Sequence, residues 1–241
     1  MYQKVFKRYE IKYLLNKKQK EIVLEELKKY MDLDQYGRTV IRNLYFDTSN
    51  YLLIRRSIEK PLYKEKIRIR TYKKASADSE VFVEIKKKYD HIVYKRRIAL
   101  KLLNALNWLD DKEECGKQNQ IVNEIEYFKS FYKELKPAMF LSYEREAYYD
   151  KVDRTFRVTF DEKLRARNYD LSLEKDAYCI ELLDDDKVLM EIKCNGGIPL
   201  WLVNVLSKEK IYRTSFSKYG RAYEKLIFDD LKFKVNNKEE R

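Results

Sequence analysis

The stretch KIRIRTY, residues 66–72, alternates with the period of two that predicts a β-strand. Side chains of a strand point alternately to opposite faces, so Lys66, Arg68 and Arg70 share one face. Cations two residues apart are separated by roughly 7 Å and repel by about 0.6 kcal/mol per pair in bulk water, or about 2.4 kcal/mol at an effective dielectric near 20. A water-facing strand tolerates such a row. A strand that faces an enclosed space needs carboxylates, water and a bound anion to offset the repulsion.

Five further segments repeat this design, with charged side chains on one face and apolar side chains on the other. They are RYEIKY (8–13), EVFVEIKKK (80–88), SYEREAYY (142–149), RVTFD (157–161) and VLMEIK (188–193). Any one of them is typical of a half-solvated strand whose polar face meets water. Water-facing strands usually mix charge signs, however, because like charges on neighbouring strands repel. The six together therefore favour charged faces that line a common hollow and bind a polyvalent anion, for which the arginine fork suits phosphate.

Strands dominate the predicted elements, and amphipathic helices lie between them. The predicted strands are 5–14, 39–47, 63–73, 80–88, 92–100, 139–149, 152–161, 178–183 and 187–194. Helices are predicted from 17 to 30 after Asn16, from 119 to 135 before Pro137, from Pro199, and after Ser217. The helices need the apolar strand faces as partners. The sequence thus predicts an α+β fold, an antiparallel closed β-barrel with helices packed on the outside.

Composition predicts one soluble domain over residues 1–241, with a matched core of about 6–228. Only 5 glycines and 3 prolines occur, and no linker composition marks a boundary. The net charge of +12 favours polyanionic partners. Three cysteines without CxxC spacing and the single His91, in a predicted hairpin turn, give no metal or triad pattern. No apolar run reaches the length of a membrane span, so a cytoplasmic location is expected. We expect a frayed tail over 232–241, and residues 170–178 resist assignment.

The ordered set EIKY, YFDT, KIRIRTY, VFVEIKKK, SYEREAYY, RVTFD, VLMEIK and SFSKYGRAY resembles the vacuolar transporter chaperone (VTC) polyphosphate polymerases of the triphosphate tunnel superfamily. The resemblance implies a β-tunnel, CYTH-like in fold, that binds ATP and inorganic polyphosphate with Mn²⁺ or Mg²⁺. It implies transfer of the γ-phosphoryl group of ATP to a growing polyphosphate chain. Eukaryotic members carry a regulatory domain and membrane spans that this sequence lacks, so transport of the product into a vacuole is not expected.

The same resemblance assigns site residues by motif. The expected catalytic residues are Arg68, Arg70, Arg145, Arg157 and Lys193. The expected phosphate-binding residues are Lys12, Lys86, Tyr143, Ser217 and Lys218, and the expected metal ligand is Glu191. Lys95 and Arg97 are weaker candidates, because the strand register around them is uncertain.

Two other kinds of function stay open. Hydrolases and cyclases of the superfamily share the tunnel but typically have an early strand with the motif ExExK. This sequence has Arg8 in place of the first glutamate of that motif. The change favours transfer over triphosphate hydrolysis. A binding module for polyphosphate or nucleotide would show no turnover. An RNA-binding module should place aromatic residues beside the cations. Tyr143 and Phe82 do so in part, but most tyrosines, such as Tyr9, lie on the opposite face, so no nucleic acid partner is expected. The oligomeric state stays open.

Overall fold

The computed structural model describes residues 9–90 and 92–228. Arg8, His91 and the expected tail over 232–241 therefore lie outside the described residues.

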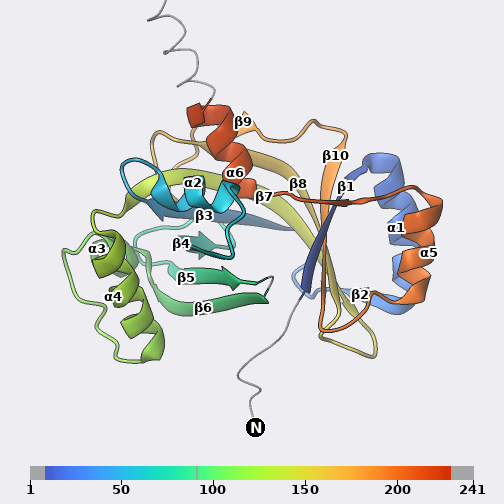
Figure 1. Cartoon of the computed structure of the whole chain (residues 1–241), viewed down its shortest axis with the longest axis horizontal. Coiled ribbons are helices and arrows are strands. Elements are labelled where there is room, and N and C mark those ends of the chain that lie inside the picture. Colours follow the sequence, from blue (N-terminus) through green and yellow to red (C-terminus); the bar gives the residue numbers. More distant parts are fainter. Residues whose placement is uncertain (1–8, 91, 229–241) are drawn as a thin grey trace, which may run out of the picture.

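One curved antiparallel sheet organises the described chain (Figure 1). Its main path runs β11-β1-β10-β8-β7-β3-β4-β5-β6, with β2 paired to β7 and β9 paired to β8. The strands are β1 Tyr9–Asn16, β2 Met31–Leu33, β3 Thr39–Asp47, β4 Tyr63–Thr71, β5 Glu80–Tyr89, β6 Ile92–Lys101, β7 Lys136–Asp150, β8 Arg157–Arg167, β9 Ile180–Glu181, β10 Lys187–Cys194 and β11 Arg213–Thr214. The prediction of an α+β protein with an antiparallel sheet is confirmed.

The prediction that the sheet closes into a barrel is wrong. Among the described residues, β6 pairs only with β5, and it makes no ladder with β1. The second edge of β1 is taken in part by β11, where Lys12 lies opposite Thr214 and Tyr13 opposite Arg213. An ion pair crosses the opening instead: Lys86 Nζ on β5 lies 2.7 Å from Glu10 Oε2 on β1. We call this opening, bridged by side chains rather than by backbone, the seam.

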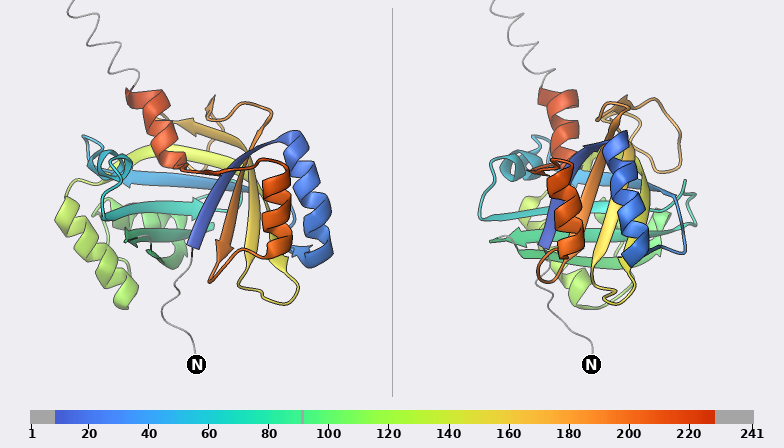
Figure 2. Two further views of the ribbon diagram at one scale, coloured as in Figure 1. Left: turned by 45° about the vertical axis from the view of Figure 1, so that its right-hand side comes forward. Right: turned by 90° about the vertical axis from the view of Figure 1, so that its right-hand side faces the viewer.

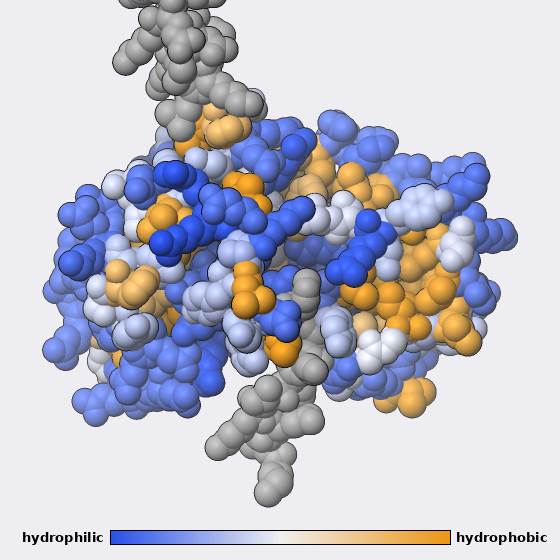
Figure 3. Space-filling model, viewed as in Figure 1, coloured by the Kyte–Doolittle hydropathy of each residue, from blue (hydrophilic) through white to orange (hydrophobic). Residues whose placement is uncertain are grey.

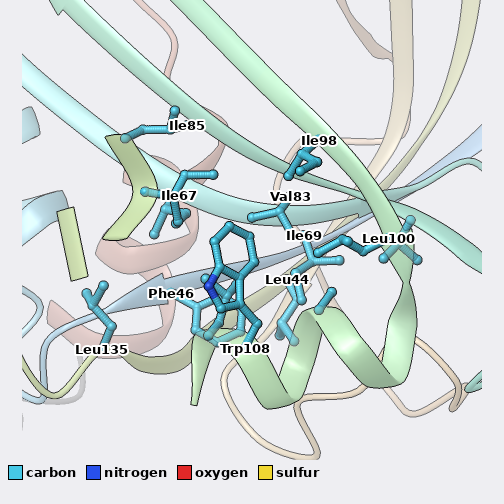
Figure 4. Packing of buried hydrophobic residues seen from close by; sticks show 14 of the residues in the cluster. Leu44, Phe46, Ile67, Ile69, Val83, Ile85, Ile98, Leu100, Trp108 and Leu135 are labelled. Atoms are coloured by element: carbon cyan, nitrogen blue, oxygen red, sulfur yellow. The ribbon is translucent and has the colours of Figure 1, made fainter. Parts of the chain in front are cut away.

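Four helices cover the convex face of the sheet, and three of them, α1, α4 and α5, were predicted from the sequence. Helices α1 (Lys17–Tyr30) and α5 (Leu200–Lys208) lie side by side over β1, β10 and β8, where Leu27 and Leu202 share one core cluster (Figure 2). Helices α3 (Leu102–Leu109) and α4 (Gln120–Tyr132) cover β4, β5 and β6. There Trp108 of α3 packs among Ile67, Val83 and their neighbours (Figure 4). The apolar faces of the strands are therefore buried by helices.

A further helix, α6 (Lys218–Tyr223), packs on the concave face, which corrects the prediction that all helices lie outside. It continues as one π-helical turn over Glu224–Phe228. Two core clusters lie under the helices of the convex face, and a third lies between α6 and an apolar part of the concave face. The third core cluster includes Ile41, Leu141 and Leu189. Helix α2 (Leu52–Ile58) contributes Ile54 to this cluster. The helix thus fills one part of the hollow and leaves the charged remainder open.

Several boundaries differ from the predictions. Helices α2 and α3 were not predicted. The strand expected over 152–161 is β8 at Arg157–Arg167, because the carboxylates of Asp150 and Asp153 accept backbone N–H groups in a turn before it. The strand expected over 178–183 is limited to Ile180–Glu181. In the described part of the chain, no helix is long and apolar enough to cross a membrane.

Candidate functional site

The hollow beside α6 is a cavity of about 970 Å³, large enough for a ligand of nucleotide size. Alternate residues of β1, β4, β5, β7 and β10 face it, together with the segment that leads into α6. Sixteen lysine and arginine side chains and five carboxylates line it among the described residues. The cavity therefore carries a large excess of positive charge.

The cavity brings together ten of the eleven site residues predicted from the sequence. They are Lys12, Arg68, Arg70, Lys86, Tyr143, Arg145, Glu191, Lys193, Ser217 and Lys218. Lys95 also lines it. Eight of the ten lie on strand faces that the period-two pattern predicted to be charged, whereas Ser217 and Lys218 lie at the start of α6.

Arg157 and Arg97 are not among the residues that line the cavity. The Arg157 guanidinium carbon lies 4.6 Å from the centre of the Tyr149 ring, and Arg157 Nη2 is 3.9 Å from Asp34 Oδ2. Arg97 lies over the Phe82 ring at 4.6 Å. Both residues share the concave face with the site but have aromatic neighbours there. A buried atom, Arg157 Nε, has no hydrogen-bond partner among the described residues.

Glu84 holds three cations together at the centre of the β4–β5–β6 part of the sheet. Its side chain is buried, and its Oε2 atom accepts hydrogen bonds from Arg68 Nε at 2.9 Å and Nη2 at 2.8 Å. Lys95 Nζ lies 2.6 Å from Oε1, and Arg70 Nε lies 3.6 Å from Oε2. Burial would raise the pKa of the Glu84 carboxyl, but Arg68, Arg70 and Lys95 outweigh it and lower the pKa well below the usual range. Glu84 is therefore ionised and fixes the arginines.

Asp161 on β8 also holds cations in place. Both of its oxygens accept hydrogen bonds from Arg145, at 2.6 and 2.7 Å, and Lys218 Nζ lies 2.6 Å from Oδ2. The Asp161 side chain is fully buried, and these cations overcome the effect of burial and lower its pKa to about 2. Tyr143 lies beneath Lys218, whose Nζ is 4.8 Å from the ring centre. Burial would raise the Tyr143 pKa, yet Arg145, Arg70 and Lys218 lower it to about 8.

Glu191, the metal ligand expected from the sequence, lines the cavity. Its Oε2 atom lies 3.3 Å from Lys193 Nζ and 3.6 Å from Arg145 Nη2, so its ion pairs are longer than those of Asp161. These cations and Lys12 hold its pKa well below the usual value despite burial. The described residues contain no group of three or more histidine, cysteine, aspartate or glutamate residues that could hold a metal. The donor set fits a hard divalent cation held by one carboxylate and the phosphates of a substrate, as Mg²⁺ often is.

Six lysines of the cavity form no ion pair with any described residue, and we call the five that lie outside the C-terminal helical segment, that is, all except Lys225, the lysine group. They are Lys12, Lys60, Lys64, Lys66 and Lys88. The register places Lys64 opposite Lys88, and Lys66 opposite Lys86, which is in turn opposite Lys95. Burial and the neighbouring cations lower the pKa of Lys66 to about 7, and mainly burial lowers that of Lys12 to about 8. Like charges directly opposite one another destabilise a sheet. An anion bound beside the lysine group would therefore stabilise the folded protein.

Ser217 joins the lysine group to α6. Its hydroxyl oxygen accepts a hydrogen bond from Lys66 Nζ at 3.1 Å and from the backbone N–H of Gly220 at 3.1 Å. A Cβ atom at Gly220 would approach Ser217 Cβ to 3.1 Å, so the glycine permits this tight start of the helix. Tyr219, two residues after Ser217, stacks on Tyr45 with ring centres 4.6 Å apart. The Tyr45 hydroxyl in turn accepts a hydrogen bond from Arg68 at 2.7 Å.

Sequence reasoning missed the carboxylates that hold the cations and most of the lysine group. Glu10, Glu84, Asp161 and Lys66 share the strand faces of the predicted residues, so parity alone could have found them. Lys60 could not have been found in this way, because it lies in the connection between α2 and β4.

A concave antiparallel sheet around a cation-lined cavity is the architecture expected for the triphosphate tunnel superfamily, and a solved structure shares the fold. A protein from Bacillus halodurans, described as a candidate adenylate cyclase, is 14% identical over 88% of this chain and 95% of its own, with a TM-score of 0.54. A protein from Vibrio parahaemolyticus with the same description is 10% identical over 91% of this chain and 98% of its own, with a TM-score of 0.48. No curated protein matches the chain.

A family model described as VTC domain matches residues 7–227, and the chain therefore belongs to the VTC domain family. The family predicted from the ordered motifs is confirmed.

Proposed function

We propose that the protein is a polyphosphate polymerase, which transfers the γ-phosphoryl group of ATP to the end of an inorganic polyphosphate chain. The observation that carries this proposal is the lysine group beside the fixed arginines. An internal phosphate contributes about one negative charge and a terminal phosphate about two. One nucleoside triphosphate thus leaves much of the excess of cations over carboxylates unmatched. A second phosphate chain in the same cavity would match it, as transfer between two chains requires.

Charge neutralisation and alignment account for most of the catalysis in phosphoryl transfer. Arg68, Arg70 and Arg145 would bind non-bridging oxygens of the reacting phosphates, since Glu84 and Asp161 hold their guanidinium groups in place. A terminal oxygen of the chain attacks the γ-phosphorus, the bridging bond to the β-phosphate breaks, and ADP leaves with that electron pair. The attacking oxygen is already ionised, so no general base is needed. Lys12, Lys193 and Lys218 would stabilise the charge on the leaving group or on the incoming chain end.

Glu191 would hold a divalent cation, Mn²⁺ or Mg²⁺, together with the phosphates. The bound cation would neutralise charge on the reacting phosphate. Among the other carboxylates near the arginines, Glu84 and Asp161 are tied in short ion pairs, and Glu10 is paired with Lys86. This leaves few carboxylates beside Arg68, Arg70 and Arg145 to activate water and favours transfer over hydrolysis by a triphosphatase.

The test is incubation of the purified protein with ATP and Mn²⁺, followed by a gel that separates acid-labile polyphosphate by length. We expect polyphosphate with wild type, and at least a hundredfold less with Arg68→Ala, which removes a group that would bind the reacting phosphates, or with Glu191→Gln, which removes the proposed ligand of the divalent cation. Orthophosphate as the only product would indicate a triphosphatase. A cyclic nucleotide would indicate a cyclase, and tight binding without turnover would indicate a binding module.

A further inference from the structure

Most of the side chains that line the cavity are charged or polar, but apolar side chains face it as well. Leu14 on β1, Leu183 before β10 and Phe216 before α6 all line the cavity, and we call them the apolar shelf. Leu14 follows Glu10 and Lys12 on the same face of β1, and 39% of its surface is exposed. The alternation of charged side chains on this strand thus ends in an exposed leucine.

The fold brings the three side chains of the shelf to the same region. Strand β1 lies between β10 and β11 in the sheet, and Leu14 is opposite Leu189 of β10. The turn that follows Leu183 meets the end of β1, where the N–H of Lys17 donates to the carbonyl of Asp186 at 3.0 Å. Phe216 is tied to β1 as well, since its carbonyl accepts a hydrogen bond from Lys12 Nζ at 2.6 Å. Leu183 and Phe216 pack against the cluster that contains Leu189, so these two side chains of the shelf form a rim of the third core cluster.

An apolar rim offers little to a phosphate chain, which is charged along its whole length. It stabilises a ligand that has an apolar part next to its phosphates, because burying apolar surface is favourable. Polar side chains border the shelf, among them Thr214 opposite Lys12, and Asp184 after Leu183. Apolar lining with a few polar groups is typical of sites for small organic ligands.

We propose that the apolar shelf binds the base and ribose of the nucleoside triphosphate, so that the nucleotide enters the cation-lined cavity from the side of β1, β10 and the start of α6. The inorganic chain then lies along Lys64 and Lys88, which are opposite one another on β4 and β5. This inference rests on the proposed function, because it assumes that ATP is the phosphoryl donor.

The test compares two ligands by isothermal titration calorimetry in the presence of Mg²⁺: ATP, and inorganic tripolyphosphate, which has no nucleoside. We expect Leu14→Ala to weaken ATP binding about fivefold, since it removes part of the apolar surface that the base covers. The affinity for tripolyphosphate should stay unchanged, which also shows that the variant is folded. Ile58→Ala is the matched control: Ile58 is 36% exposed and lines the same cavity from α2, outside the shelf. It should change neither affinity.

Each other outcome overturns the inference. Leu14→Ala could weaken the binding of both ligands equally, or the binding of neither. Ile58→Ala could weaken ATP binding as much as Leu14→Ala does. Any of these results would show that the shelf does not recognise the nucleoside. Binding of tripolyphosphate without ATP binding in wild type would reject the shelf but leave a phosphate-binding cavity. If wild type bound neither ligand, the proposed function itself would be wrong.

Discussion

At the scale of single residues, the carboxylates are what make the cavity possible. Glu84 and Asp161 are buried, and each is held by two or three cations. Buried ion pairs gain little net stability when they form, but removing one partner leaves buried charges uncompensated. The carboxylates therefore serve to fix the arginines and to make a charged interior tolerable.

Glu84→Gln should lower the free energy of unfolding by about 3 kcal/mol, because Arg68, Arg70 and Lys95 would lose their shared anion. Urea denaturation followed by circular dichroism measures this loss. Glu26→Gln is the control, since Glu26 pairs with the exposed Lys29 alone among the described residues, and it should change stability by less than about 0.5 kcal/mol. Saturating tripolyphosphate should restore more stability to Glu84→Gln than it adds to wild type; equal gains would contradict the role of Glu84 as an internal counterion.

Lys66 should make binding of phosphate chains depend on pH. Its pKa of about 7 lies below the usual 10.5 of lysine, so above pH 7 the free protein carries it largely neutral, and a bound polyanion requires it to take up a proton. The dissociation constant of tripolyphosphate should therefore rise between pH 7 and 9, by at most about tenfold per pH unit for one group. In Lys66→Met the rise should be smaller, while the surface variant Lys29→Met should behave as wild type. Affinity that is constant over this range would contradict the prediction.

The same lysine affects stability in the opposite direction when no ligand is bound. Between pH 7 and about 10.5 the unfolded chain binds more protons at this site than the folded protein does, so the free energy of unfolding should rise with pH.

At the scale of elements, Asp47 connects three of them. This residue ends β3, and its carboxylate accepts N–H groups of Leu53 and Ile54 at 2.8 and 3.0 Å, which caps α2. It also accepts the hydroxyl of Tyr219 in α6 at 2.9 Å. Asp47 thereby positions the helix that carries Ser217 and Lys218 at its start.

Asp47→Ala should expose the amides of α6 to hydrogen exchange at least tenfold more than those of α1, because it removes the link between β3 and α6. Exchange measured by mass spectrometry gives the comparison. Asn16→Ala, which removes the side-chain cap of α1, is the matched control and should show the reverse pattern. Equal loosening of both helices in Asp47→Ala would mean that Asp47 only stabilises the protein as a whole.

The elements also show where sequence reasoning succeeds. Long alternating strands such as β4 and β5 could be predicted closely, because half of their residues are buried by helices and half are charged. Helix α2 could not, since it has seven residues, begins after Tyr51 in the left-handed region with φ of 58°, and takes its cap from Asp47 several residues earlier. Its stabilising contacts come from the tertiary structure and leave no local signal.

At the scale of the whole molecule, periodicity predicts which face of each strand is charged but not whether the sheet closes. Closure depends on which strand occupies the edge of β1, and the two-residue strand β11 is too short to be recognised in a sequence. The sequence did not predict the apolar part of the concave face, for a related reason. Leu189 shares a strand face with Glu191 and Lys193, and only the position of α6 shows that it is buried.

The whole molecule should be stabilised by a condensed phosphate far more than by salt. The lysine group repels itself in the free protein, and a ligand at one hundred times its dissociation constant adds about 2.7 kcal/mol to the free energy of unfolding. Differential scanning calorimetry should show a higher melting temperature with tripolyphosphate than with sodium chloride at equal ionic strength. Orthophosphate, a single phosphate group, should give an intermediate shift. Equal shifts for all three would contradict a specific anion site.

The seam between β1 and β6 has a consequence for how a long polymer reaches the site. A complete cylinder admits a polymer only when a free end threads through it. Here Lys86 and Glu10 span the opening through one side-chain contact, and parting them breaks no strand pairing among the described residues. The middle of a polyphosphate chain could thus enter the cavity sideways through the seam. A polyphosphate that is blocked at both termini should therefore still compete for the cavity.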